Sequence, residues 1–252
     1  NGQFTHYNKS TVPSLPSNQT WTVLDGGDNN LYIGHVGSGF SIFSLKDKSV
    51  KNFQNETGNP ASLPGNDVFC IIKDTNGNIW LGTNNGLALY NAANENFITF
   101  RNNKNDKYAT LCSRILSIRQ LKDNRLWIAS ELNGIAILNL KQGMFLSPEE
   151  LSIEYIQEGD DSRSLSNASA RCIFQDSFDN VWIGTWGGGI NFISSKPPLF
   201  TTLSYSPIPN NENSLNNKVA SSLCMDRQGR VWIGTDGGGI NVFEGEKRIA
   251  IY

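Results

Sequence analysis

The sequence predicts an all-β protein, a β-propeller of about five four-stranded blades. Three observations predict this fold. A tryptophan-centred motif returns about every 50 residues, each copy contains short apolar runs separated by turn residues, and no segment keeps a helical period of 3.6 residues. Four short antiparallel strands in each period are typical of one propeller blade.

The motif is centred on one aromatic residue in each copy, and the spacings between these anchors are 48, 47, 55 and 50 residues. The five anchors are Tyr32, Trp80, Trp127, Trp182 and Trp232. The copies at Tyr32 and Trp127 have diverged, with His35 in place of the usual Thr and Ala129 in place of the usual Gly. Because the tryptophans share one repeat position, we expect them to pack between blades rather than to bind a ligand.

The second copy predicts the elements of a blade in order. Its first strand covers Val68–Lys73, and residues 74–78 (Asp-Thr-Asn-Gly-Asn) form a hairpin turn, because Asn and Gly accept positive φ and Asp caps its own turn. The second strand carries Trp80, Gly86 supplies the next turn into the third strand, and the fourth strand covers residues 96–101. An Asp lies six residues before the Trp in three copies, at Asp74, Asp176 and Asp226.

The numbers of predicted strands indicate that the ring continues beyond this chain. Fourth-strand candidates lie near Phe53, Phe97, Tyr155, Phe200 and Ile249, and residues 4–7 form a sixth with no blade before it. We therefore expect residues 1–252 to be one propeller region, in which residues 1–11 hold the last strand of a preceding blade. The intact ring is then larger than these five blades. A closed five-bladed ring is the alternative, because propellers contain roughly four to eight blades.

Composition excludes several function classes. The net charge is −2 and the isoelectric point about 5.7, which argues against a nucleic-acid or anionic-membrane surface. His6 and His35 are the only histidines, so no metal site and no cofactor are predicted. The cysteines, none in a C-x-x-C pair, are expected to be buried thiols without disulfides, since they fall in separate blades. They are Cys70, Cys112, Cys172 and Cys224.

The repeat resembles the two-component regulator propeller repeat. The residues that carry the resemblance are Ser-Leu, then Asp-x-x-Gly-Asn-Ile/Val-Trp-Ile-Gly-Thr, then Gly-Gly-Gly-Ile-Asn. Residues 164–191 and 214–241 are close matches, with Asp179 in place of the Gly in the first and Arg230 in place of the Asn in the second. The resemblance implies a periplasmic sensor region of a Bacteroides-type hybrid two-component system that binds glycan fragments and controls polysaccharide use. It also implies that this propeller has seven blades and that the protein contains a second seven-bladed propeller, an immunoglobulin-like domain and a membrane helix. A histidine kinase, a receiver, a DNA-binding domain and a dimeric sensor are implied as well.

Candidate ligand residues are those that depart from the repeat on one rim, because the repeated residues form the scaffold. At the turn after the second strand these are His35, Asn84, Glu131, Trp186 and Asp236. Trp186 can stack on a sugar ring, and Arg114 and Arg171, near the first strands, can bind a carboxylate or sulfate. In the alternative, Trp186 packs on the next blade and the arginines pair with Asp or Glu.

Three function classes follow from these residues. A glycan-sensing module binds an oligosaccharide without turnover. A propeller lyase or glycosidase needs convergent carboxylates or a His or Tyr base, and the sequence predicts no such catalytic set, so we expect no enzyme in this region. A protein-binding scaffold uses the rim or the blade faces to form a homodimer.

Overall fold

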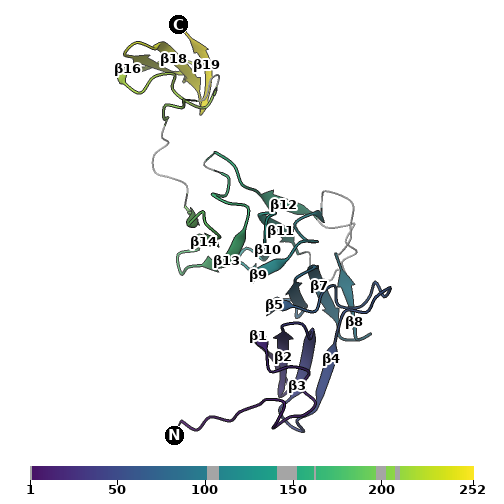
Figure 1. The fold of residues 1–252 in the computed structure, drawn as a ribbon. Coiled ribbons are helices and arrows are strands. Elements are labelled where there is room, and N and C mark those ends of the chain that lie inside the picture. Colours follow the sequence, from purple (N-terminus) through teal and green to yellow (C-terminus); the bar gives the residue numbers. More distant parts are fainter. Residues whose placement is uncertain (1, 101–107, 141–151, 162, 197–202, 208–210) are drawn as a thin grey trace. The chain divides into compact units, whose positions relative to one another are not determined.

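The computed structural model of the chain is built from five antiparallel sheets (Figure 1). It describes residues 2–100, 108–140, 152–161, 163–196, 203–207 and 211–252. The chain divides into two compact units, Asn1–Lys196 with four sheets and Pro197–Tyr252 with one. In the part of the chain that the structure describes, no helix has the length and apolarity needed to cross a membrane.

Every sheet is a meander whose strands pair in chain order. In the first unit, the first sheet contains β1 (Thr20–Gly27), β2 (Asn30–His35), β3 (Phe40–Ser44) and β4 (Val50–Phe53). The second contains β5 (Val68–Lys73), β6 (Ile79–Thr83), β7 (Gly86–Asn91) and β8 (Asn96–Thr99). The third contains β9 (Ile115–Gln120), β10 (Arg125–Ser130), β11 (Ile135–Asn139) and β12 (Ile153–Ile156).

The fourth sheet has three strands among the described residues, β13 (Ala170–Gln175), β14 (Val181–Thr185) and β15 (Ile190–Ile193). The fourth strand predicted near Phe200 lies outside the described residues. The second unit holds β16 (Ala220–Met225), β17 (Val231–Thr235), β18 (Gly239–Glu244) and β19 (Lys247–Ile251). These sheets are blades of a β-propeller, as the repeat predicts.

Two of the predicted strands differ in the structure. The strand expected over residues 96–101 ends at Thr99, and Arg101 lies outside the described residues. Residues 4–7 form no strand, because no neighbouring strand supplies hydrogen-bond partners there, and Phe4 is 89% exposed. Tyr7 instead packs edge-on against Phe43, with ring centroids 5.1 Å apart. The assignment of residues 1–11 to a preceding blade stays a prediction.

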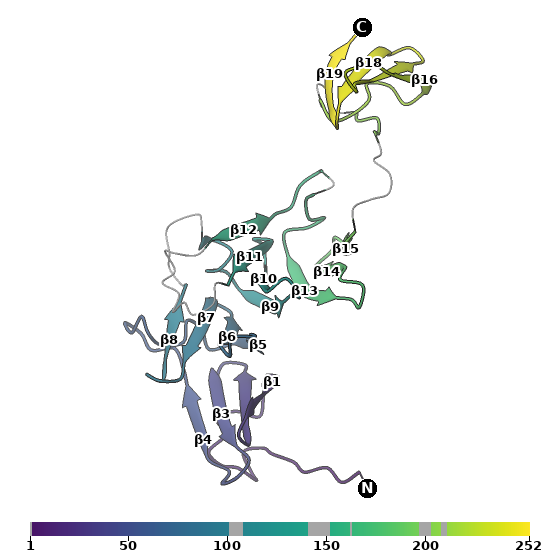
Figure 2. The same ribbon diagram turned by 180° about the vertical axis from the view of Figure 1, so that it is seen from behind.

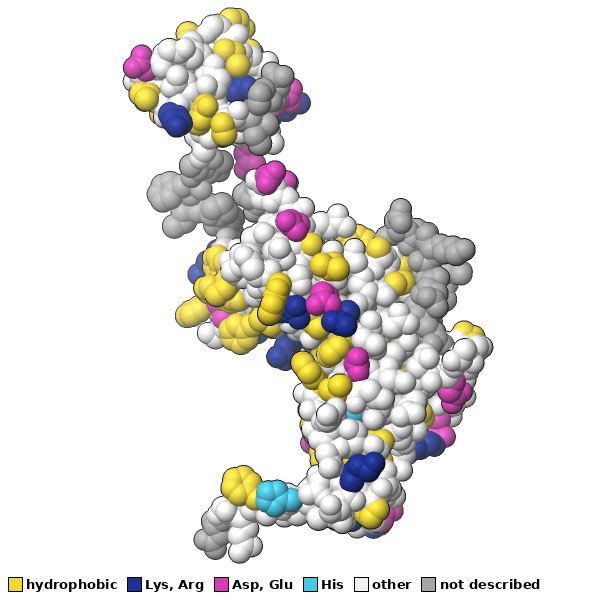
Figure 3. Space-filling view, in the orientation of Figure 1, with side chains coloured by type: hydrophobic (Ala, Val, Ile, Leu, Met, Phe, Trp, Pro, Cys, Tyr) yellow, Lys and Arg dark blue, Asp and Glu magenta, His cyan; other side chains and the backbone are white. Residues whose placement is uncertain are grey.

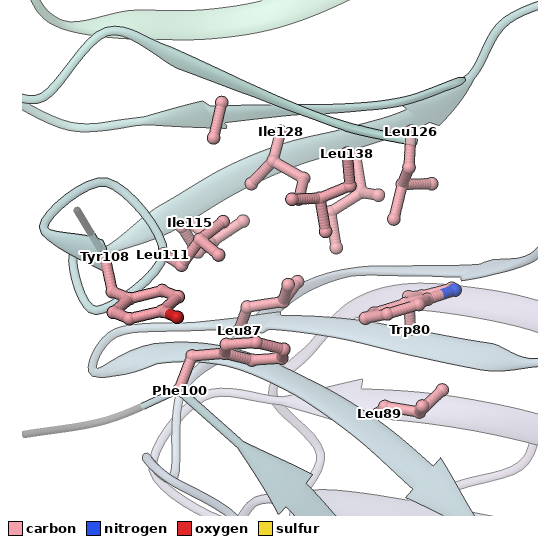
Figure 4. Packing of buried hydrophobic residues seen from close by; sticks show 12 residues of the cluster. Trp80, Leu87, Leu89, Phe100, Tyr108, Leu111, Ile115, Leu126, Ile128 and Leu138 are labelled. Atoms are coloured by element: carbon pink, nitrogen blue, oxygen red, sulfur yellow. The ribbon is translucent and has the colours of Figure 1, made fainter. Parts of the chain in front are cut away.

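The hydrophobic core of the first unit lies between successive blades. Trp80 is fully buried in a cluster with Leu126 and Leu138 of the next blade (Figure 4), and Trp127 packs in turn with Val181 and other residues of the fourth blade. The predicted role in blade packing is confirmed for these two tryptophans. Trp182 keeps 39% of its surface exposed, because the described part of its unit contains no sheet beyond β15.

The first strands of the four blades in this unit lie next to one another in the order β1, β5, β9 and β13 (Figures 1 and 2). Residues at the start of these strands can therefore contact their counterparts on the neighbouring blades. This arrangement positions the candidate site.

Candidate ligand-binding rim

At the hairpin end, three of the five blades share a scaffold that is built around the aspartate of the turn. The Oδ2 atom of Asp74 accepts the indole N–H of Trp80 at 2.9 Å, and its Oδ1 atom accepts the backbone N–H groups of Asn76 and Asn78. The same indole bond joins Trp182 to Asp176, and Trp232 to Asp226. The bond from Trp232 is the main cause that lowers the pKa of Asp226 to about 2, and the corresponding bond lowers the pKa of Asp176.

The third blade lacks this acceptor. Leu121 occupies the position six residues before Trp127, and the buried indole N–H of Trp127 has no hydrogen-bond partner among the described residues. The sequence indicates that this copy is divergent. The structure shows that the divergence leaves the tryptophan indole without its hydrogen-bond acceptor.

At the opposite end, every blade makes the same backbone hydrogen bond, but the side chains around this bond differ from blade to blade. The residue after the second strand donates its N–H to the carbonyl just before the first strand. The five pairs are Val36–Gln19, Asn84–Asp67, Glu131–Arg114, Trp186–Ser169 and Asp236–Val219. The first-blade counterpart of Trp186 is therefore Val36, and not His35 as predicted.

His35 is wrong as a candidate ligand residue for a second reason. Its side chain is fully buried, and its Nε2 atom lies 2.8 Å from the hydroxyl of Ser41. Burial lowers the pKa of the imidazole. The ring replaces the threonine that binds the turn carbonyl in other copies, as Thr185 binds Gly189, so it belongs to the interior of the blade.

Each first strand also contains a β-bulge near its start. The register breaks between Val68 and Cys70 and between Ala170 and Cys172, for example, which leaves one extra residue in the strand. The extra residues lie eleven positions before the anchors and are Trp21, Phe69, Leu116, Arg171 and Ser221. A bulge re-aims the side chain that it carries and is frequent beside functional sites.

The arginines and the glutamate predicted as ligand residues form one connected group. Arg114 Nη1 lies 2.9 Å from Glu131 Oε2, and Arg171 Nη2 lies 3.1 Å from Glu131 Oε1. Both arginines are thus paired with an acidic residue, as the alternative interpretation expects. The group links the third blade to the fourth.

Trp186 lies at one end of this group. The guanidinium of Arg171 sits 4.6 Å from the centroid of its ring, and the tryptophan remains 69% exposed. The side chain is therefore open to solvent instead of being covered by another blade of its unit. An exposed indole held by a cation is suited to stacking on a flat partner.

Two aromatic residues that sequence reasoning missed continue the group in the other direction. The guanidinium of Arg114 lies 5.7 Å from the ring centroid of Phe69, and Phe69 meets Trp21 edge-on at 5.4 Å. We call the connected residues the rim ladder: Trp21, Phe69, Arg114, Glu131, Arg171 and Trp186. Figure 3 shows basic, acidic and hydrophobic side chains side by side on the face that carries β9 and β13. Trp21 and Phe69 each lie eleven residues before the anchor of their own copy, and this shared position is the sequence signal that could have identified them.

The remaining candidates lie outside the rim ladder. Asn84 is exposed, and its Oδ1 atom accepts the backbone N–H of Asp67 at 3.2 Å, which shapes its own blade. Asp236 is exposed on the second unit. Of the predicted residues, the structure thus brings together Arg114, Glu131, Arg171 and Trp186.

The blades, the repeated turn scaffold and the variable rim define the chain as a β-propeller built from a sequence repeat. The family model described as the two-component regulator propeller matches residues 62–85, 164–187 and 214–237. The chain carries the two-component regulator propeller repeat in these three segments. They contain the anchors Trp80, Trp182 and Trp232.

Similar proteins agree with this repeat. The chain is 60% identical to the extracellular domain of the hybrid two-component system BT3049 from B. thetaiotaomicron, covering 98% of this chain and 29% of that one with a TM-score of 0.66. The extracellular domain of the system BT4673 from the same organism is 19% identical with a TM-score of 0.55 and supports the fold alone. Histidine kinase P4 of Formosa agariphila is 33% identical over 92 residues. The chain spans 29% of the first structure and 7% of this kinase.

Proposed function

We propose that this chain is part of the extracytoplasmic sensor region of a hybrid two-component regulator, and that it detects glycan fragments for the control of polysaccharide use. The 60% identity to an extracellular domain of such a system supports the first part. In this proposal the region lies in the periplasm and binds its ligand without turnover. Kinase chemistry belongs to other domains of the same protein, and the sensor works as a dimer.

The observation that carries the ligand proposal is the rim ladder. An indole that is 69% exposed lies 4.6 Å from a guanidinium, beside a carboxylate that is shared by two arginines. Flat aromatic faces stack on the apolar faces of sugar rings, while charged and amide groups bind hydroxyls. The blade repeats its scaffold residues but not these residues, which favours a ligand-binding role for them.

Calorimetric titration of the complete sensor region with an oligosaccharide panel tests the proposal. Saturable binding without a new product by chromatography is the expected result, and Trp186→Ala should weaken it at least tenfold. Phe178→Ala is the matched control, because Phe178 is 74% exposed on the same blade but lies in the turn at its other end. Equal losses in the two variants, or no saccharide binding at all, would contradict the proposal.

A further inference from the structure

We infer that the rim ladder binds an acidic oligosaccharide, with a carboxylate or sulfate group seated on Arg114 and Arg171 and further sugar rings reaching toward Trp21. This inference rests on the proposed function. It adds the charge of the ligand, its extended length, and two binding residues, Trp21 and Phe69.

The charge of the ladder favours an anion. Two guanidiniums share one carboxylate, so the group keeps one positive charge in excess. The three side chains remain open to solvent, with 46% of Arg114, 35% of Arg171 and 24% of Glu131 exposed. An anion can therefore reach the guanidiniums from the solvent side.

Hydrogen-bond donors remain free for that anion. A guanidinium has five N–H donors in a fixed fork that matches carboxylates and sulfates. Each arginine uses one Nη atom in its ion pair with Glu131, which leaves the other Nη atom of its fork for an anion. The Nε atom of Arg171 and the hydroxyl of Ser169, two residues before it in the chain, are buried and have no hydrogen-bond partner among the described residues. Ser169 as a whole is only 5% exposed, and its carbonyl accepts the backbone N–H of Trp186. Buried polar groups of this kind are costly unless a partner satisfies them.

The ends of the ladder favour a ligand of several sugar units. Trp186 lies on the fourth blade and Trp21 on the first, and they are 69% and 62% exposed. Four other side chains lie between them in the chain of contacts, so a ligand that follows the contacts from one tryptophan to the other passes all four. Each end offers a flat aromatic face, and the centre offers the cations. An oligosaccharide with an anionic group between stacking rings matches that order.

The test compares acidic oligosaccharides with neutral forms of the same sugar chain. Hexamers of galacturonate and their fully methyl-esterified forms are titrated into the complete sensor region, together with a sulfated galactan hexamer and its desulfated form. At least one charged hexamer should bind about tenfold or more tightly than its neutral partner, because a charge-assisted bond exceeds a neutral one by about that factor. The preferred pair distinguishes a carboxylate ligand from a sulfate ligand.

Three variants examine the residues. Glu131→Gln removes the carboxylate that competes with the ligand for the two arginines, so this variant should bind the charged hexamer more tightly. The double variant Arg114→Gln with Arg171→Gln should bind the charged hexamer only as tightly as the neutral hexamer. Arg119→Gln, an exposed arginine of β9 outside the ladder, is the control. Trp21→Ala should weaken a hexamer more than a dimer of the same sugar.

The outcomes separate this inference from the proposed function. Equal affinity for charged and neutral hexamers overturns the acidic ligand and leaves glycan sensing in place. An equal effect of Trp21→Ala on dimer and hexamer overturns the extended site. Failure of every saccharide to bind overturns both proposals.

Discussion

The two ends of the same blade follow opposite rules. At the hairpin end, Asp74, Asp176 and Asp226 each accept the indole N–H of their own tryptophan at 2.9 Å. At the other end the backbone bond is repeated in all five blades, but the residue that makes it is a valine, an asparagine, a glutamate, a tryptophan or an aspartate.

This difference separates scaffold from site. An interaction that recurs in several blades holds the common fold, because these blades have the same turn to close and the same indole to orient. Where every blade makes the same backbone hydrogen bond but the side chain differs, the fold does not depend on that side chain. The side chain can then serve a function that is specific to its own blade. The rim ladder consists of residues of the second kind, and the following predictions test the separation.

The largest expected effect is at a buried anchor. Trp80→Ala removes a side chain that is fully buried between two blades, and should lower the free energy of unfolding by about 3–5 kcal/mol. Trp21→Ala, at a tryptophan of the same unit that is 62% exposed, should cost clearly less. Denaturant unfolding followed by tryptophan fluorescence and circular dichroism measures both. Equal losses would mean that burial does not set the contribution of the anchor.

The next effect is at the aspartate of the turn. Asp74→Ala leaves the buried indole N–H of Trp80 and two backbone N–H groups without their acceptor, at a cost of about 2 kcal/mol. Asp74→Asn keeps an acceptor oxygen and should lose less. The same unfolding experiment measures the difference, and an unchanged stability in Asp74→Ala would remove the turn from the scaffold.

A smaller effect is expected in acid. Hydrogen bonds, first that from Trp232, lower the pKa of Asp226 from 3.8 to about 2 in the folded state. A lowered pKa stabilises the fold above the unfolded value, and this stabilisation is lost as the pH falls through the folded value. The unfolding free energy should thus decline between pH 4 and 2, and less steeply in Asp226→Asn. Asp236→Asn, on the same blade, is the control. An identical decline in wild type and Asp226→Asn would contradict the assignment.

The smallest effect on stability is expected at the rim. Trp186→Ala removes an indole that is 69% exposed and contacts a cation, so the free energy of unfolding should fall by less than about 1 kcal/mol. Thermal unfolding measured with and without an oligosaccharide ligand separates folding from binding. A loss near that of Trp80→Ala would make this residue part of the scaffold.

Particular residues show how far sequence reasoning reached. The strand Val68–Lys73 was predicted with its observed bounds, because apolar alternation and the Asp-x-x-Gly turn are local signals. His35 was assigned to the rim because its sequence position adjoins the turn, and only the backbone pairing shows that Val36 holds the equivalent place. Trp21 and Phe69 were missed because a bulge shifts side chains by one residue and breaks the alternation of the strand, so only their shared distance from the anchors indicated them.

The sequence by itself determined the repeat, the four-stranded blade and the position of the scaffold residues, since these depend on turn chemistry and apolar spacing within about 50 residues. The tertiary structure alone decided which variable residues meet. Arg114 and Arg171 share Glu131, and Trp21 reaches Phe69, because the first strands of successive blades lie side by side. Contacts between blades join residues 40 or more positions apart, and no local pattern in the chain predicts which of these residues meet.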